Sequence, residues 1–112
     1  ERLAAETLIR RGDRILARNF HCPFGEIDLV AEDGEDLIFV EVKTRRGSSF
    51  GPPEEAITRR KQRTILQVAR YYLYQHACQH RSWRVDVVAV QLSTHGKLEE
   101  IRVYKHAIIE ET

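Results

Sequence analysis

Residues 25–46 read GEIDLVAEDGEDLIFVEVKTRR, and this stretch decides the fold. Two runs rich in branched apolar residues, 26–32 and 35–43, flank the dipeptide Asp33-Gly34. An Asp-Gly pair between two such runs is a strong short-range signal for a β-hairpin with a tight turn. The stretch therefore predicts two adjacent antiparallel strands, and the rest of the chain is interpreted around them.

The register of this hairpin brings charged side chains to one side of the sheet. With Asp33-Gly34 as the two-residue turn, Glu26 faces Glu41, while Asp28 faces Phe39 and lies diagonally across from Glu41. Residues that face each other, and residues two apart on one strand, share a side of the sheet. The predicted polar side carries Glu26, Asp28, Glu41 and Lys43. The predicted apolar side carries Ile27, Leu29, Ile38, Val40 and Val42.

Asp28 and Glu41 are candidate ligands for a divalent cation. Diagonal neighbours have main chains about 7–8 Å apart, so their carboxylates can meet at one Mg²⁺ with metal–oxygen distances of about 2.0–2.1 Å. Such an ion polarises a phosphoryl oxygen and lowers the pKa of a bound water, as phosphodiester hydrolysis requires. Lys43 points the same way and can orient that water. The plain alternative is a solvated strand face, which antiparallel hairpins often have.

The segments on either side of the hairpin complete one domain. Before it, residues 1–11 are predicted as a helix that Gly12 ends, and residues 14–20 as a strand. After it, a loop at 45–53 leads to a long helix over about 53–80 and to strands at 84–92 and 98–105. The order α-β-β-β-α-β-β predicts a single α/β domain over residues 1–112, with a mixed central sheet flanked by helices.

The composition is that of an ordinary globular protein. The chain has 112 residues, of which 42% are hydrophobic and 31% charged, and its net charge is +1. No apolar run approaches the roughly 18 residues of a membrane span, and no signal-peptide pattern is seen. Cys22 and Cys78 form no metal-binding spacing and are interpreted as reduced thiols. These observations predict a cytoplasmic protein with no membrane partner.

Basic residues gather in two places despite the small net charge. Arg45 and Arg46 follow the second strand of the hairpin, and four more basic residues open the long helix: Arg59, Arg60, Lys61 and Arg63. Such residues bind nucleic-acid phosphates without reading base sequence. A solvated basic helix face is the alternative. No helix-turn-helix or RNA-recognition motif is present, so recognition of nucleic-acid shape is favoured over recognition of bases.

Four segments in order carry a resemblance: FGEIDLVAEDG, LIFVEVKTRR, FGPPEEAI followed by Lys61, and RVDVVAV. Together they resemble the bacterial YraN family, which is similar to the archaeal Holliday-junction resolvases and to the restriction-endonuclease-like nucleases. The resemblance extends from Glu1 to about Val103. It implies a restriction-endonuclease-like fold.

The resemblance also implies roles for single residues. Asp28 matches the first acidic position of those nucleases, and Glu41 and Lys43 match their Glu-x-Lys half. Glu1 matches a glutamate on the first helix that would approach the metal. Ser48 matches a hydroxyl residue near the scissile phosphate. The implied catalytic set is therefore Asp28, Glu41, Lys43 and Glu1, with the three acids as metal ligands.

The function predicted from these features is that of an endonuclease dependent on Mg²⁺ or Mn²⁺, which hydrolyses phosphodiester bonds in DNA. Branched or structured DNA is the candidate substrate, and a homodimer is a hypothesis because the similar resolvases act as dimers. The alternative is a non-catalytic module that binds nucleic acid, or a partner protein, and keeps the nuclease fold.

Overall fold

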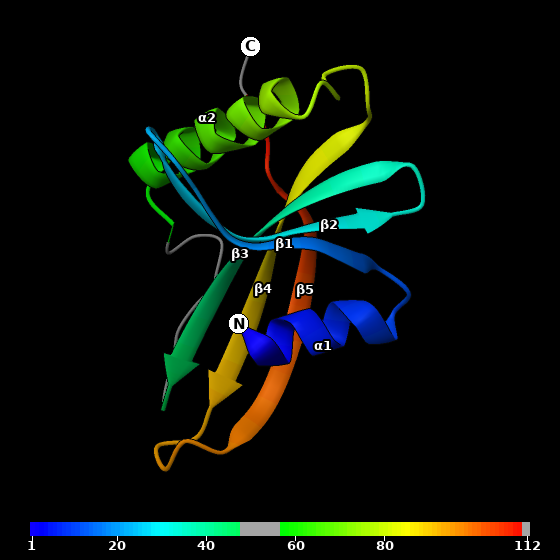
Figure 1. Ribbon diagram of the computed structural model, residues 1–112. Helices are drawn as coiled ribbons and strands as arrows, with labels where there is room; N and C mark the ends of the chain where they lie inside the picture. Colours follow the sequence, from blue (N-terminus) through cyan, green and yellow to red (C-terminus); the bar gives the residue numbers. More distant parts are fainter. Residues whose placement is uncertain (48–56, 111–112) are drawn as a thin grey trace.

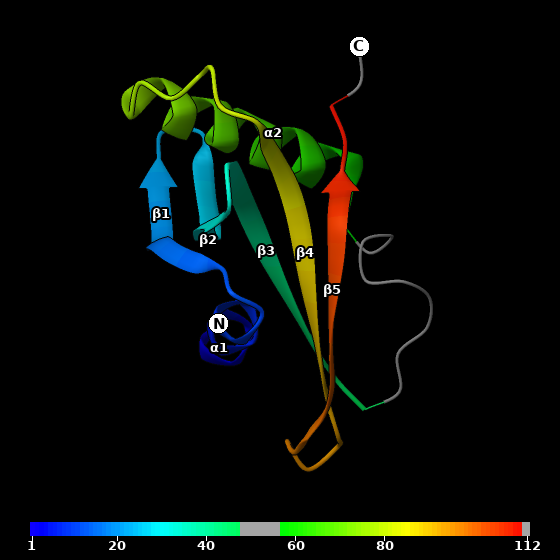
Figure 2. The ribbon, with the colours of Figure 1, turned by 90° about the vertical axis from the view of Figure 1, so that its right-hand side faces the viewer.

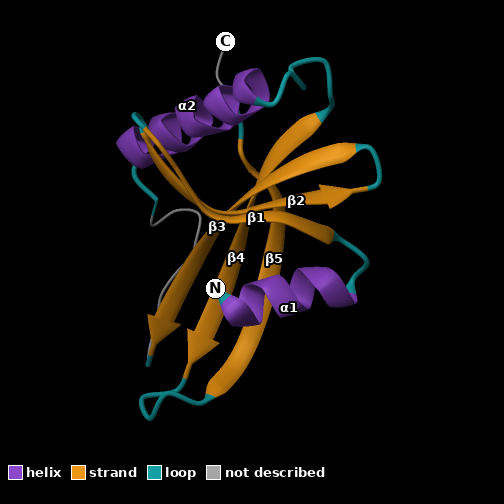
Figure 3. Cartoon of the chain, viewed as in Figure 1, coloured by secondary structure: helices purple, strands orange, loops and turns teal. Residues whose placement is uncertain are grey.

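A mixed five-stranded sheet lies between two helices in the computed structural model, which describes residues 1–47 and 57–110 (Figure 1). The elements in chain order are α1 (Arg2–Arg10), β1 (Arg14–Cys22), β2 (Gly25–Asp33), β3 (Asp36–Arg46), α2 (Arg59–Gln75), β4 (Trp83–Leu92) and β5 (Leu98–Ile108). This confirms the predicted α/β class and the order α-β-β-β-α-β-β (Figure 3).

The strands lie side by side in the order β1-β2-β3-β4-β5. Every neighbouring pair is antiparallel except β3 and β4, which are parallel and are joined through α2. A parallel pair needs a crossover of this kind, and a helix is its usual form. Figure 2 shows the strands between α2 on one side and α1 on the other. In the described residues, neither helix has the length and apolar character needed to cross a bilayer.

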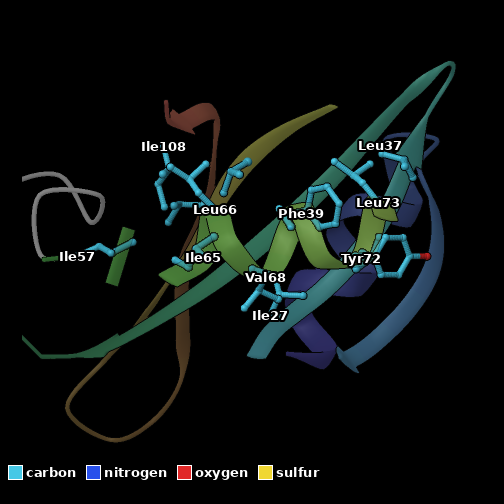
Figure 4. Packing of buried hydrophobic residues seen from close by; sticks show 14 residues of the cluster. Ile27, Leu37, Phe39, Ile57, Ile65, Leu66, Val68, Tyr72, Leu73 and Ile108 are labelled. Carbon is cyan, nitrogen blue, oxygen red and sulfur yellow. The ribbon is translucent and has the colours of Figure 1, made fainter. Parts of the chain in front are cut away.

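Both sides of the sheet are buried, each beneath one helix. The cluster under α2 contains aliphatic and aromatic side chains from the helix and from the strands (Figure 4), among them Ile27, Phe39, Ile65, Val68, Tyr72 and Val87. The cluster under α1 contains Ala4, Ala5, Leu8, Leu29, Ala31, Ile38, Val40, Val88 and Val90. Because a helix packs on each side of the sheet, a charged residue beneath α2 or α1 is partly desolvated.

The hairpin turn lies one residue later than predicted. Asp33 pairs with Asp36, so Gly34 and Glu35 form the turn, and Gly34 takes the positive φ of 60° that such a turn requires. The facing residues consequently shift by two positions, and a shift by an even number does not by itself move a side chain to the other side of the sheet. The physical reason lies outside the hairpin: Arg84 of β4 donates to Asp36 Oδ2 and to Asp33 Oδ2, both at 3.2 Å.

The predicted division of the hairpin into a polar and an apolar side needs correction. Leu29, Ile38, Val40 and Val42 pack toward α1 as one set, but Ile27 packs with the cluster under α2. The alternation of β2 therefore breaks at Asp28, between Ile27 and Leu29. The side that was predicted to be polar also carries Phe39 and is covered by α2.

Helix α2 is shorter than the predicted 53–80. Thr58 is its N-cap, and the Thr58 side chain accepts a hydrogen bond from Lys61 N at 3.1 Å. Residues 53–56 lie outside the described residues. At the other end Ala77 has a φ of 52°, and Cys78 N donates to Leu73 O in a Schellman motif. Glycine is the usual residue at this left-handed position. Because alanine takes it here, the sequence carries no glycine that would have marked the end of the helix.

Candidate carboxylate site

Asp28 and Glu41 lie opposite each other on neighbouring strands. The last regular pair of β2 and β3 is Leu29 with Val40, and one further step of that register brings Asp28 level with Glu41. Beyond this pair the strands separate, and the Val42 amide donates to Asp28 Oδ2 at 2.7 Å. The Asp28 and Glu41 side chains nevertheless interact directly, through a hydrogen bond between the two carboxyl groups. The two carboxylates therefore converge on the α2 side of the sheet.

Lys61 of α2 completes a group of three charges. Its Nζ lies 3.6 Å from Glu41 Oε2, and the Glu41 side chain is only 13% exposed. Lys61 was predicted to lie on a phosphate-binding helix face, and its contact with the carboxylates was not predicted. A signal was present: Lys61 lies at helical spacing from Ile65, Val68 and Tyr72, which pack against the sheet.

The environment of Glu41 opposes its ionisation. Burial, followed by a hydrogen bond with Asp28 and the charge of Asp28, raises the pKa of Glu41 from 4.5 to about 7. Lys61 acts in the opposite direction but does not cancel these effects. A carboxyl group with a pKa near neutrality, beside a second carboxylate, is stabilised in its charged form by any cation that binds between them.

Glu41→Gln is expected to stabilise the metal-free protein at pH 8 by on the order of 1–2 kcal/mol, after allowance for solvent screening, and to have little effect at pH 5. The folded pKa of Glu41 is about 7 and the unfolded value about 4.5. The stability contributed by the protonated carboxyl is thus fully present below pH 4.5 and is lost as the pH rises through 7. Glutamine keeps the neutral state at every pH.

Urea denaturation of both proteins at pH 5, 6.5 and 8, without divalent metal, measures this difference. Glu26→Gln is the matched control, because Glu26 lies on the neighbouring strand β2 but is exposed and should show no such trend. A Glu41→Gln variant that loses equal stability at pH 5 and pH 8 would contradict the raised pKa.

The other predicted site residues are placed in different ways. Lys43, two residues after Glu41 on β3, is half-buried and shares its side of the sheet. Glu26 is 56% exposed and contacts His21 Nδ1 at 3.2 Å, apart from the Asp28–Glu41 pair. Glu1 is exposed at the start of α1, which packs on the other side of the sheet. Ser48 lies outside the described residues.

The oxygen ligands available to a metal are therefore few. Across residues 1–47 and 57–110, no group of three or more His, Cys, Asp or Glu residues has the geometry to hold a metal ion. Asp28 and Glu41 are therefore a pair of possible metal ligands. The role of Glu1 as a third ligand remains a prediction. A pair is compatible with Mg²⁺, because this ion retains several waters and is commonly bound through one or two carboxylates.

The predicted basic surface is present on α2. Arg59, Arg60 and Arg63 are exposed on the first turns of the helix, and Arg45 and Arg46 lie at the end of β3. A hollow of about 660 Å³ lies between α2 and residues 109–110 and is lined by Arg59, Arg60, Gln62, Arg63, Thr64, Leu66, Gln67, Arg70, Ile109 and Glu110. Most of its charged groups are cationic, so the hollow attracts anions.

A second group of charges lies on the α1 side of the sheet. Asp86 of β4 is fully buried and accepts hydrogen bonds from Arg84 Nε at 3.0 Å and from the His106 amide at 2.9 Å. Arg11, just after α1, reaches the same carboxylate at 3.5 Å. Arg84 lies on the same strand as Asp86, whereas Arg11 follows α1 and His106 lies on β5, so the buried charge is compensated and ties β4 to both neighbours.

The fold and this site define a small α/β domain with paired carboxylates on adjacent strands and a basic helix beside them. Residues 1–90 match the family described as "Uncharacterised protein family UPF0102". The chain belongs to this family, as the YraN resemblance predicted.

Two relatives match almost the whole chain. A UPF0102 protein of Moorella thermoacetica is 44% identical over 107 residues, which is 96% of this chain and 89% of the relative. A UPF0102 protein of Caldicellulosiruptor saccharolyticus is 42% identical over 107 residues, with coverage of 96% and 91%. These relatives identify the family, and their names state no activity.

Proposed function

We propose that this protein is a divalent-metal-dependent nuclease that hydrolyses phosphodiester bonds in DNA. The observation that carries the proposal is the Asp28–Glu41 pair, two facing carboxylates partly buried beneath α2. Two such groups repel each other and lose hydration, which is costly unless a cation binds them. An exposed strand surface would not incur this cost.

The residues present fit a hard cation with oxygen ligands. Asp28 and Glu41 supply carboxylate oxygens from neighbouring strands, at the point where the pairing of β2 with β3 ends. When bound, Mg²⁺ or Mn²⁺ would stabilise charge on the phosphoryl group and lower the pKa of a water. Glu1 would join these ligands if its side chain reached the ion.

The chain's own basic groups would orient the substrate. Lys43 follows Glu41 on the same side of β3, where its ammonium can donate to a phosphoryl oxygen and hold the attacking water. The flanking phosphates would be contacted by the Ser48 hydroxyl, as the family resemblance implies, and by basic side chains: Arg45, Arg46, Arg59, Arg60 and Arg63. Contacts of this kind follow backbone shape and suit branched or structured DNA.

A cleavage assay tests the proposed function. Labelled junction, flap, single-stranded and duplex DNAs are incubated with the protein in Mg²⁺, in Mn²⁺ and in EDTA. We expect metal-dependent cleavage, fastest on a branched substrate, and no product in EDTA. Wild-type protein that binds DNA but cleaves none of these substrates with either metal would refute the nuclease.

A second candidate is a non-catalytic nucleic-acid-binding module. The contact between Lys61 and Glu41 favours it, because a lysine can neutralise part of the buried acid charge in place of a metal. In that case the carboxylates serve the fold, and the arginines of α2 provide the binding surface. Binding without cleavage in the assay above would select this candidate.

Arg63→Gln is expected to reduce the salt dependence of DNA binding by about 0.9 in the slope of log K against log salt concentration, the loss of one phosphate contact. Fluorescence anisotropy between 50 and 200 mM KCl measures the slope. Arg2→Gln is the control, because Arg2 is an exposed arginine on α1 rather than α2. Equal slopes for wild type and Arg63→Gln would remove Arg63 from the binding surface.

A further inference from the structure

We propose that Lys61 is a built-in counter-ion that competes with the divalent metal for Glu41 and is released toward the substrate phosphate when the metal binds. The inference rests on the proposed function and adds a residue to that site. It starts from one contact, between Lys61 Nζ of α2 and Glu41 Oε2 of β3, which joins two elements across the buried side of the sheet.

The contact has the character of an exchangeable ion pair. At 3.6 Å the two atoms are farther apart than the 2.7–3.2 Å of a well-formed N–H···O hydrogen bond, so Coulomb attraction dominates. The Lys61 side chain is 43% exposed, whereas Glu41 is 13% exposed. The lysine therefore approaches a buried acid from the solvent side and can withdraw without disturbing the core.

The backbone of Lys61 is held in place while its side chain is free to move. Lys61 N donates to the Thr58 side chain at the first turn of α2, and Ile65 anchors the next turn in the core. A lysine side chain has a flexible four-carbon stem and a compact charge, so its ammonium can move by several ångströms at small energetic cost. The ammonium can thus change partner without movement of the helix.

A divalent ion and this ammonium cannot share Glu41 favourably. Both are attracted to the same carboxylate, and at the few ångströms between them their positive charges repel in a partly desolvated site. Metal binding would therefore displace Lys61 from Glu41. The nearest new anion is the phosphate drawn to the metal, which the freed ammonium can approach from the α2 side and whose charge it can partly neutralise.

Metal binding to the full chain without DNA tests the proposal. Isothermal titration with MnCl₂ at pH 7.5 is performed on wild type, Lys61→Met, Lys61→Arg and Arg60→Met. We expect Lys61→Met to bind Mn²⁺ about threefold to tenfold more tightly, since an internal competitor is gone. Lys61→Arg should remain close to wild type. Arg60→Met removes an exposed charge one position away and should leave the affinity unchanged.

The same variants are then assayed for DNA cleavage, where Lys61→Met should be at least tenfold slower than wild type in saturating Mn²⁺. Tighter metal binding with slower cleavage is the result that a purely structural lysine would not produce. Unchanged or weaker Mn²⁺ binding by folded Lys61→Met, in a wild type that binds metal and cleaves DNA, overturns this inference alone. A wild type that neither binds Mn²⁺ nor cleaves DNA overturns the proposed function and the inference with it.

Discussion

Asp28→Asn is expected to lower the rate of metal-dependent DNA cleavage by about a thousandfold, equivalent to several kcal/mol of lost transition-state stabilisation. The amide has nearly the shape of the carboxylate, and its oxygen can still accept the hydrogen bond from the Val42 amide. The fold at the end of the β2–β3 pairing is therefore retained. The negative charge that holds the cation opposite Glu41 is lost.

Single-turnover cleavage of the preferred DNA in Mg²⁺ measures the effect, and thermal unfolding verifies the fold. Glu26→Gln is the matched control: it neutralises an exposed acid two residues away on β2, and cleavage should stay within about twofold of wild type. DNA binding by Asp28→Asn should persist, because the arginines of α2 are untouched. An Asp28→Asn variant as active as the control would exclude the carboxylate pair as the catalytic centre.

Asp86→Ala is expected to destabilise the protein by about 3–5 kcal/mol, the usual loss when one partner of a buried ion pair is removed. The variant leaves the Arg84 guanidinium, which is largely buried, without its nearest acid, and leaves the His106 amide without an acceptor. Both are penalties on groups that remain in the core after the mutation.

Guanidinium chloride unfolding, followed by circular dichroism, measures this loss. Asp36→Ala is the control, because Asp36 binds the same Arg84 but its side chain is 44% exposed. Its removal should cost less than about 1 kcal/mol, as for other exposed pairs. Similar losses of unfolding free energy in Asp86→Ala and Asp36→Ala would show that burial does not determine how much each acid contributes to stability.

Local periodicity explains what could be predicted of the site. Alternation along a strand depends on backbone geometry alone, and the apolar runs around Asp33-Gly34 were sufficient to indicate a hairpin. Asp28 and Glu41 were accordingly predicted on one side of the sheet. The turn lies one residue later than predicted, which shifts facing residues by two and preserves that result, because only an odd shift of the pairing moves a strand's side chains to the other side.

Other features depend on residues far apart in the chain. The turn position follows from Arg84, which lies about fifty residues after Asp33 and binds it only because β4 lies parallel to β3. The contact of Lys61 with Glu41 depends on how α2 crosses the sheet. The break in the alternation of β2 at Asp28, which puts Ile27 under α2, depends on the separation of β2 from β3. None of these three features follows from the spacing of residues within one segment of the chain.

The amino-acid sequence by itself determined the order of the elements, the hairpin and the shared side of Asp28 and Glu41, because each follows from patterns within a few residues. Only the tertiary structure decided that this side is covered by a helix, that Lys61 reaches Glu41, and that Asp86 is compensated by Arg11 and Arg84. The physical reason is that burial and charge pairing are properties of packed elements, and these arise when helices and strands distant in sequence meet.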